Sequence, residues 1–182
     1  MIYLCSSSPT RAMLLDKFKI DYIQKSVDFD EERIDTDDAR EFVYLASKGK
    51  LQSAISLYGL DTPLLSADTV IVSDKKEILR KPKTKEEAKE ILLKQSGSYI
   101  SIISSLHYQS REFLFTNISS TKYHFKKFDN DKLEEYLDSN LWQGKAGGCM
   151  VEGFCKDYIK MVDGLESCAM GLQVEILKGW IR

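Results

Sequence analysis

Apolar residues recur along the first part of the chain in patterns that predict a strand and two helices. A short apolar strand opens the sequence at residues 2–5, and helical spacing of apolar residues predicts a helix over residues 9–18. A longer amphipathic helix follows the helix-start signal at residues 36–38 and runs to about residue 58, where Gly59 ends it. This part of the chain is therefore expected to alternate strands with helices.

Strand patterns dominate the middle of the chain. The nearly unbroken apolar run at residues 64–72 is typical of a strand covered on both faces. Residues 98–108 and 111–128 are rich in β-branched and aromatic residues and predict two long antiparallel strands. Further expected elements are a helix to about Lys94 that starts at the capping box Thr84…Glu87, a helix at 130–138 capped by Asp129, a flexible glycine region at 144–153, a strand near 157–162 and a last helix near 165–177. The pattern predicts an α/β protein with a mixed sheet.

Composition, with 43% hydrophobic and 30% charged residues, fits one globular domain or one domain with a small lobe, and we expect a single domain that spans residues 1–182. The net charge of −2 gives no basic surface for a nucleic acid. No apolar run approaches the roughly 20 residues of a membrane span, and no secretory leader pattern is present. We therefore expect a cytoplasmic protein without nucleic-acid or membrane partners.

The four cysteines contain no C-x-x-C pair, and the chain has only two histidines. This combination argues against a structural zinc site. Scattered cysteines fit a reducing compartment, and we expect buried thiols, with Cys5 inside the first strand.

The segment from Ser6 to Arg11 joins the first strand to the first helix. Its hydroxyl-rich turn and its guanidinium offer backbone N–H groups and a cation to an anion, which predicts a phosphate site. The same residues also fit an ordinary serine N-cap followed by Pro9 in the first helical turn. The segment alone leaves both interpretations open.

Asp68 lies in the middle of the strand that is expected to be buried. A carboxylate there is costly unless a metal ion, a pair of lysines or backbone amides compensate it. Lys48 in the long helix and Lys81 before a proline are candidate cations, although each alone also fits a solvated surface charge. Together with Arg11 and Glu31, these residues predict a triphosphate and metal site.

Several short motifs occur in one order along the chain. They are Ser6–Arg11, Asp30-Glu31, Lys48, Ala67–Val70, Lys81-Pro82, Ser96-Gly97 and Lys145–Gly147 with Glu152-Gly153. In order and spacing the chain resembles the Maf family, the nucleoside triphosphate pyrophosphatases of the inosine-triphosphatase-like superfamily, over roughly residues 2–175. The resemblance implies a strongly twisted mixed sheet flanked by helices, with a central cleft.

The resemblance also implies roles for individual residues. Asp68 corresponds to the essential proton acceptor, and Glu31, Lys48 and Lys81 to further catalytic residues. Ser6, Ser8 and Arg11 would bind the substrate phosphates, and Thr10, Thr69 and Glu152 would set base specificity. Asp68 and Glu31 would also bind a divalent cation, Mg²⁺ or Mn²⁺, and the sequence leaves open which of them is base and which is ligand.

The choice of nucleotide rests on departures from the family pattern. Thr10 replaces a usual arginine, and Glu152 stands where pyrimidine-type members carry glutamine, resembling instead the members that act on 7-methyl-GTP. A carboxylate only accepts hydrogen bonds, and a guanine edge offers two adjacent donors. The favoured hypothesis is hydrolysis of guanine-type or modified nucleotides. The alternatives are a dTTP/UTP pyrophosphatase, a nucleotide-binding cell-division regulator without turnover, and a Glu152 that faces solvent or caps the glycine region.

Three further departures lie elsewhere: Gly144 replaces an aspartate, Gln173 a proline, and Ser104-Ser105 a Thr-Gly pair. Members of the family are often dimers, and the aromatic-rich strand at 113–128 is a candidate apolar edge. A homodimer and a monomer both remain open.

Overall fold

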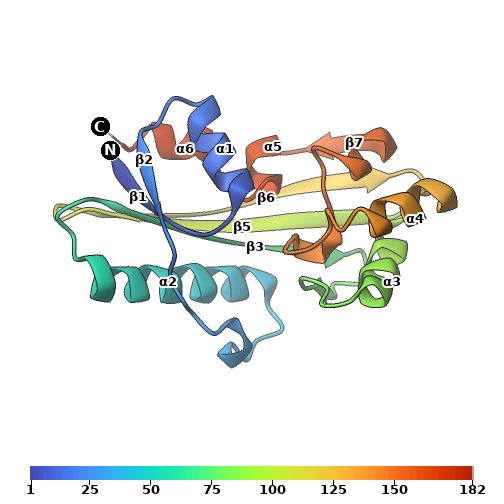
Figure 1. Cartoon of the computed structure of the whole chain (residues 1–182), viewed down its shortest axis with the longest axis horizontal. Coiled ribbons are helices and arrows are strands. Elements are labelled where there is room, and N and C mark those ends of the chain that lie inside the picture. The colour runs from blue at the N-terminus through green and yellow to red at the C-terminus, as the bar shows by residue number, and fades with distance from the viewer. Residues whose placement is uncertain (182) are drawn as a thin grey trace. The chain divides into compact units, whose positions relative to one another are not determined.

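The computed structural model describes residues 1–181 and contains a seven-stranded sheet with helices packed on it (Figure 1). The strands are β1 (Ile2–Cys5), β2 (Tyr22–Lys25), β3 (Leu64–Ser73), β4 (Ile78–Leu79), β5 (Tyr99–Gln109), β6 (Leu114–Phe125) and β7 (Ile159–Asp163). The α-helices are α1 (Pro9–Lys17), α2 (Ala39–Tyr58), α3 (Lys85–Gln95), α4 (Asn130–Asp138), α5 (Glu166–Ala169) and α6 (Val174–Lys178). Three short 3₁₀ helices are η1 (Glu31–Arg33), η2 (Ala146–Gly148) and η3 (Phe154–Tyr158).

The strands follow the order β2-β1-β3-β5-β6-β7, and β4 pairs with β3 outside this path. β1 runs parallel to β2 and to β3, whereas β3 with β4 and β6 with β7 are antiparallel. The pairing of Tyr3 with Leu64 and of Leu4 with Leu65 fixes the register of β1 against β3. The predicted α/β class with a mixed sheet flanked by helices is confirmed.

Most predicted elements are present, and their ends follow from local signals. Ser8, Asp38, Thr84 and Asp129 cap the N-termini of α1, α2, α3 and α4 with their side chains. Gly59 ends α2 with a positive φ of 65°. The prediction of one helix over residues 165–177 was wrong, because the chain leaves the helical conformation at Gly171, where φ is 100°, and forms the short helices α5 and α6 instead.

The chain divides into two compact units. The first comprises Met1–Thr69, Ser104–Ser119 and the C-terminal part from Ser167 on, and the second comprises Val70–Ile103 and Ser120–Glu166. The strands β3, β5 and β6 contribute residues to both units. A single domain over the whole chain stays a prediction.

In the first unit, helices cover both faces of the strands. Alternate residues of a strand face opposite sides of the sheet. On one side, Leu4 and Leu65 pack with Leu14 and Leu15 of α1. On the other side, Cys5 packs against α2. That second cluster joins Cys5 and Leu64 to Leu51 and Ala54 of α2. Figure 1 shows α1 and α6 on one side of the strands and α2 on the other.

In the second unit, aromatic rings pack around Phe154. Its ring stacks on Tyr136 of α4 with centroids 4.6 Å apart, and it meets Phe128 and Tyr158 edge-on or tilted at 5.1 and 5.2 Å. The expected flexible glycine region at 144–153 contains η2, and η3 follows directly after it. The amide of the buried Gln95 donates to the carbonyl of Gly147 in η2 at 2.6 Å.

All four cysteines are free and buried, as predicted, and Cys5 lies at the end of β1. Among the described residues, no helix combines the length and the apolar character that crossing a membrane requires.

Candidate active site

Asp68 lies on β3, where helix and strand neighbours leave only 2% of it exposed. Its Oδ1 accepts a hydrogen bond from Lys50 Nζ at 2.5 Å. Its Oδ2 is buried and has no hydrogen-bond partner among the described residues. Burial raises the pKa of Asp68 above its ordinary value, and the positive charge of Lys50 opposes that rise. A buried oxygen without a hydrogen-bond partner costs free energy, and binding of a ligand or a proton at Oδ2 would remove this cost.

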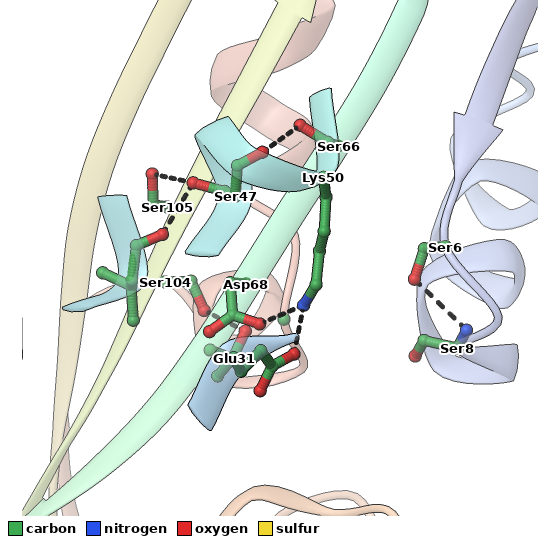
Figure 2. A network of polar contacts seen from close by, with 12 residues as sticks. Ser6, Ser8, Glu31, Ser47, Lys50, Ser66, Asp68, Ser104 and Ser105 are labelled. Atoms are coloured by element: carbon green, nitrogen blue, oxygen red, sulfur yellow. Dashed lines mark hydrogen bonds and ion pairs between the residues drawn. The ribbon is translucent and has the colours of Figure 1, made fainter. Parts of the chain in front are cut away.

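Lys50 of α2 bridges two carboxylates. Its Nζ lies 2.5 Å from Asp68 Oδ1 and 2.6 Å from Glu31 Oε1. Figure 2 draws both contacts as dashed lines. The side chains of Lys50, Asp68 and Glu31 are 14%, 3% and 26% exposed. The cluster is therefore largely buried, and Glu31 is the member most exposed to solvent. The structure therefore joins the two predicted carboxylates through a lysine that the sequence analysis did not select.

Glu31 is placed beside Lys50 by the segment that precedes it. The ring of Phe29 lies directly against the backbone of α2 at Gly49, where an added Cβ would be 2.1 Å from the ring. A glycine inside a helix costs about 1 kcal/mol relative to alanine, and this contact gives a physical reason for it. After Phe29, the side chain of Asp30 accepts from the backbone N–H of Glu32 and starts the 3₁₀ turn that carries Glu31.

Arg11 lies in the first turn of α1, and its guanidinium donates hydrogen bonds to residues of the first unit. Nε donates to the carbonyl of Gly171 at 2.8 Å, and the two terminal nitrogens donate to Ser6 Oγ at 2.9 Å and to Thr69 Oγ1 at 3.3 Å. Burial lowers the pKa of Arg11, and the negative charge of Asp68 opposes that shift. Arg11 thus places a cation close to the residue that follows Asp68.

The serines of the opening segment organise the turn itself. Ser8 is the N-cap of α1 and accepts from the backbone N–H of Arg11 at 3.4 Å, so the N-cap interpretation is confirmed for this residue. Ser6 Oγ accepts from the backbone N–H of Ser8 at 3.2 Å, and Ser6 is buried. Thr10 lies half-buried in the same turn. Phosphate binding by this segment stays a prediction.

Lys48 lies on the opposite side of α2 from the carboxylates. It is exposed, and its Nζ lies 5.4 Å from the centre of the Tyr44 ring. Lys50, and not Lys48, contacts Asp68 and Glu31, and the catalytic role predicted for Lys48 stays a prediction. The spacing of the inward-facing residues is a signal that identifies Lys50, because Val43, Ser47, Lys50 and Ala54 follow one another by four, three and four residues.

Two predicted site residues belong to the second unit. Lys81 is exposed and directly precedes the buried Pro82. Glu152 is half-buried and its Oε1 accepts from Lys145 Nζ at 3.0 Å. Glu152 is therefore one partner of an ion pair, and its predicted role in base selection stays a prediction.

A buried polar network joins α2 to β3 and β5. Ser66 Oγ donates to the carbonyl of Ser47 at 2.8 Å, and the hydroxyls of Ser47 and Ser105 are 2.8 Å apart (Figure 2). Ser47 Oγ also lies 3.1 Å from Nδ1 of His107, whose pKa burial lowers to about 4. These contacts hold the helix that carries Lys50 against the strand that carries Asp68.

Gln173, one of the departures from the family pattern, is fully buried. Its amide nitrogen donates to the carbonyl of Ser104 at 2.5 Å, and Ser104 Oγ lies 2.8 Å from Thr69 Oγ1. Gln173 therefore belongs to the packing behind Thr69.

Asp68 and Glu31 are suitable ligands for a divalent cation. Among residues 1–181 no group of three or more histidine, cysteine or acidic side chains forms a ready metal site. Magnesium, however, is usually held by one or two carboxylates together with substrate phosphates and water. The unpartnered, buried Oδ2 of Asp68 and the partly exposed Glu31 fit that donor set.

Fold and site together define an α/β protein in which a buried carboxylate, a second carboxylate and two cations suit chemistry on a phosphate-bearing molecule. The model of the Maf family, described as "Maf-like protein", matches residues 1–182, and the chain belongs to this family. The resemblance seen in the sequence is thereby confirmed.

Curated relatives match over almost the whole chain. A protein of a Nitratiruptor species named nucleoside triphosphate pyrophosphatase is 52% identical over 97% of this chain and 96% of its own length. A protein of the same name from Helicobacter pylori (strain J99 / ATCC 700824) is 40% identical over 100% of this chain and 95% of its own length. Among solved structures, the dITP/XTP pyrophosphatase of Mycobacterium abscessus matches 70% of this chain and 73% of its own, with 14% identity and a TM-score of 0.45.

Proposed function

We propose that this Maf-family protein hydrolyses nucleoside triphosphates to the nucleoside monophosphate and pyrophosphate, with a preference for guanine-type or modified bases such as 7-methyl-GTP. The observation that carries the hydrolytic part is the buried Asp68, whose Oδ2 has no partner among the described residues while Lys50 holds Oδ1. The names of the curated relatives support the same reaction.

Asp68 is the proposed general base. Lys50 fixes one carboxylate oxygen and favours the ionised form, so the other oxygen is available to take a proton from water. The water oxygen then bonds to the α-phosphorus, the bond from this phosphorus to the bridging oxygen breaks, and pyrophosphate leaves. The raised pKa of Asp68 makes the carboxylate a stronger base than an exposed aspartate.

The cations of the first unit would bind and orient the phosphates. The terminal nitrogens of Arg11 donate to Ser6 and to Thr69, and Thr69 directly follows Asp68 in the chain. The planar guanidinium suits phosphate oxygens. Glu31 would hold Mg²⁺ or Mn²⁺ while Asp68 acts as the base; in the alternative assignment, Asp68 would hold the ion and Glu31 would be the base. When bound, such an ion neutralises phosphate charge and lowers the pKa of a coordinated water.

Lys50 faces both of the proposed metal ligands. With its ammonium 2.5 and 2.6 Å from their oxygens, it offsets one of the two negative charges that the carboxylates carry. Lys50 thereby keeps Asp68 and Glu31 oriented toward one another before substrate binds.

Glu152 is the proposed base-reading residue, with Thr10 and Thr69 as further candidates. Its carboxylate retains free acceptor positions beyond the bond from Lys145, and guanine presents adjacent N1–H and 2-amino donors. A 7-methylated guanine also carries positive charge, which a carboxylate attracts.

The neighbouring lysine supports a second candidate. The ammonium of Lys145, 3.0 Å from Glu152, is a donor that suits the carbonyl oxygens of thymine or uracil. The second candidate function is therefore a dTTP/UTP pyrophosphatase built on the same first unit.

The test is pyrophosphate release by the purified chain with Mg²⁺ and a panel of standard and modified nucleoside triphosphates. Asp68→Asn should lower turnover at least about 100-fold while the protein stays folded. Asp74→Asn, an exposed aspartate just beyond β3, is the matched control and should keep wild-type turnover. Release from no nucleotide would favour a nucleotide-binding regulator, and full activity of Asp68→Asn would move the site elsewhere.

Base preference is tested separately by Glu152→Gln. The amide can donate as well as accept, so the ranking should move from guanine-type toward uracil or thymine triphosphates. Glu135→Gln, an exposed residue of α4, controls for the substitution itself. An unchanged ranking in both variants would end the proposed role of Glu152.

A further inference from the structure

Two of the four cysteines, Cys149 and Cys155, form a close thiol pair in the second unit. The Sγ atoms are 3.2 Å apart, with Cys149 donating to Cys155, and both residues are buried. A disulfide has its sulfur atoms about 2.05 Å apart. The two sulfurs therefore need to approach by little more than 1 Å to bond.

The backbone around the pair keeps both cysteines in this position. The N–H of Cys149 donates to the carbonyl of Ala146 at 3.1 Å, and the N–H of Cys155 donates to the carbonyl of Met150 at 3.0 Å. The ring of Phe154, next to Cys155, stacks on a tyrosine of α4. The backbone on which the two sulfur atoms are carried is thus held by hydrogen bonds at both cysteines.

We propose that Cys149 and Cys155 are a reversible oxidation site, which hydrogen peroxide converts to an intramolecular disulfide. Cys149 is 8% exposed and Cys155 is fully buried, so we assign the first step to Cys149 as the less buried residue. Its thiolate attacks one peroxide oxygen, the O–O bond breaks, and a sulfenic acid and the first water result. The sulfur of Cys155 then displaces the hydroxyl group, the S–S bond forms, and the second water leaves.

The protonation state of Cys149 decides the pace of the first step. Its hydrogen bond to Cys155, together with burial, raises the pKa of the Cys149 thiol well above its ordinary value. The pair therefore persists as two thiols at neutral pH until an oxidant is supplied, and the first step is slower than at an exposed thiolate.

The disulfide would close a short ring that contains Glu152. Glu152 lies between the two cysteines in sequence and pairs with Lys145 just before the ring. Oxidation therefore restricts the backbone on both sides of the residue proposed to contact the base. This coupling to substrate rests on the proposed function, whereas formation of the disulfide does not.

The test treats the folded, full-length protein with hydrogen peroxide, then unfolds it and alkylates the remaining thiols. Two of the four thiols should be lost, the chain mass should fall by two hydrogens, and peptide mapping should find Cys149 joined to Cys155. Cys5 and Cys168 serve as internal controls and should remain alkylated. A dithiol reductant should restore all four thiols.

Variants separate the pair from general oxidation. In Cys155→Ser, Cys149 should stop at a sulfur oxyacid, while Cys168→Ser should still form the disulfide. Absence of the 149–155 linkage in the wild-type protein, or loss of thiols only through links between chains, would overturn the proposal.

A kinetic measurement tests the coupling to Glu152. In the oxidised wild-type protein, KM for the preferred nucleotide should rise severalfold with little change in kcat, and the reductant should reverse this. An unchanged KM in protein shown by mass to be oxidised would refute the coupling alone. No turnover by the reduced protein would count against the proposed function and leave the disulfide result standing.

Discussion

Replacement of Lys50 by methionine is the most direct test of how the charged cluster is built. The change keeps an unbranched side chain of similar length and removes the ammonium that contacts both Asp68 and Glu31. Asp68 would then be a buried carboxylate with neither oxygen held by Lys50, facing a second carboxylate across the vacated space.

The expected cost follows from the burial of the cluster. Removing one partner of a buried ion pair costs about 3–5 kcal/mol, because the remaining charge stays desolvated. Glu31 is 26% exposed and can turn toward water, which places the expected loss near the lower end, about 3 kcal/mol. For a chain of 182 residues, 1 kcal/mol corresponds to about 2–4 °C in Tm, so Tm should fall by about 6–12 °C. Turnover should fall about 100-fold or more, since a group that orients the general base is lost.

The assay compares thermal unfolding in metal-free buffer at pH 7 with pyrophosphate release. Lys48→Met is the matched control, because Lys48 lies two residues away on the same helix and is exposed. Its stability should change by no more than about 0.5 kcal/mol. Equal losses of stability in the two variants, or a larger loss in Lys48→Met, would refute the arrangement described for the site.

Two further predictions concern the support of this site. Gly49→Ala should lower stability and turnover, because its Cβ would lie 2.1 Å from the Phe29 ring. Phe29→Leu in the same chain should restore part of both, and strictly additive losses would contradict the contact. Burial lowers the pKa of His107 from 6.5 to about 4, so the neutral imidazole is the form that the folded protein holds. Its contribution to the free energy of unfolding is therefore complete above about pH 6.5 and is lost as the pH falls toward 4, by at most about 3 kcal/mol. Unfolding from pH 7 to 4 should be less pH-dependent in His107→Gln than in wild type, and equal slopes would contradict this.

The elements with strong local signals could be predicted from the sequence. The apolar run of β3 and the period of α2 gave those elements within one or two residues of their observed ends. β2 was missed, because its four residues carry no clear alternation and it is defined by parallel pairing with β1, a long-range contact. The break between α5 and α6 was missed because one glycine at positive φ decides it.

The sequence identifies those site residues whose charge lies in a segment expected to be buried. Asp68 stood out because a carboxylate rarely interrupts a strand covered on both faces. The chain does bring Glu31 next to it, through a lysine, and Arg11 next to Thr69. The role of Phe29 in that placement could not be inferred, since it depends on a contact between a loop and a helix distant in sequence.

The choice between Lys48 and Lys50 shows what helix geometry adds to motif spacing. Each residue turns the helix by about 100°, so the two side chains point about 200° apart and only one can face the sheet. The buried residues Val43, Ser47 and Ala54 mark the inward direction, and Lys50 continues their spacing. A lysine at an inward position requires a negative partner as strictly as an aspartate in a covered strand requires a positive one. The phase of α2 and the burial of β3 together therefore predict that Lys50 pairs with Asp68. The spacing of a short motif alone does not distinguish Lys50 from Lys48.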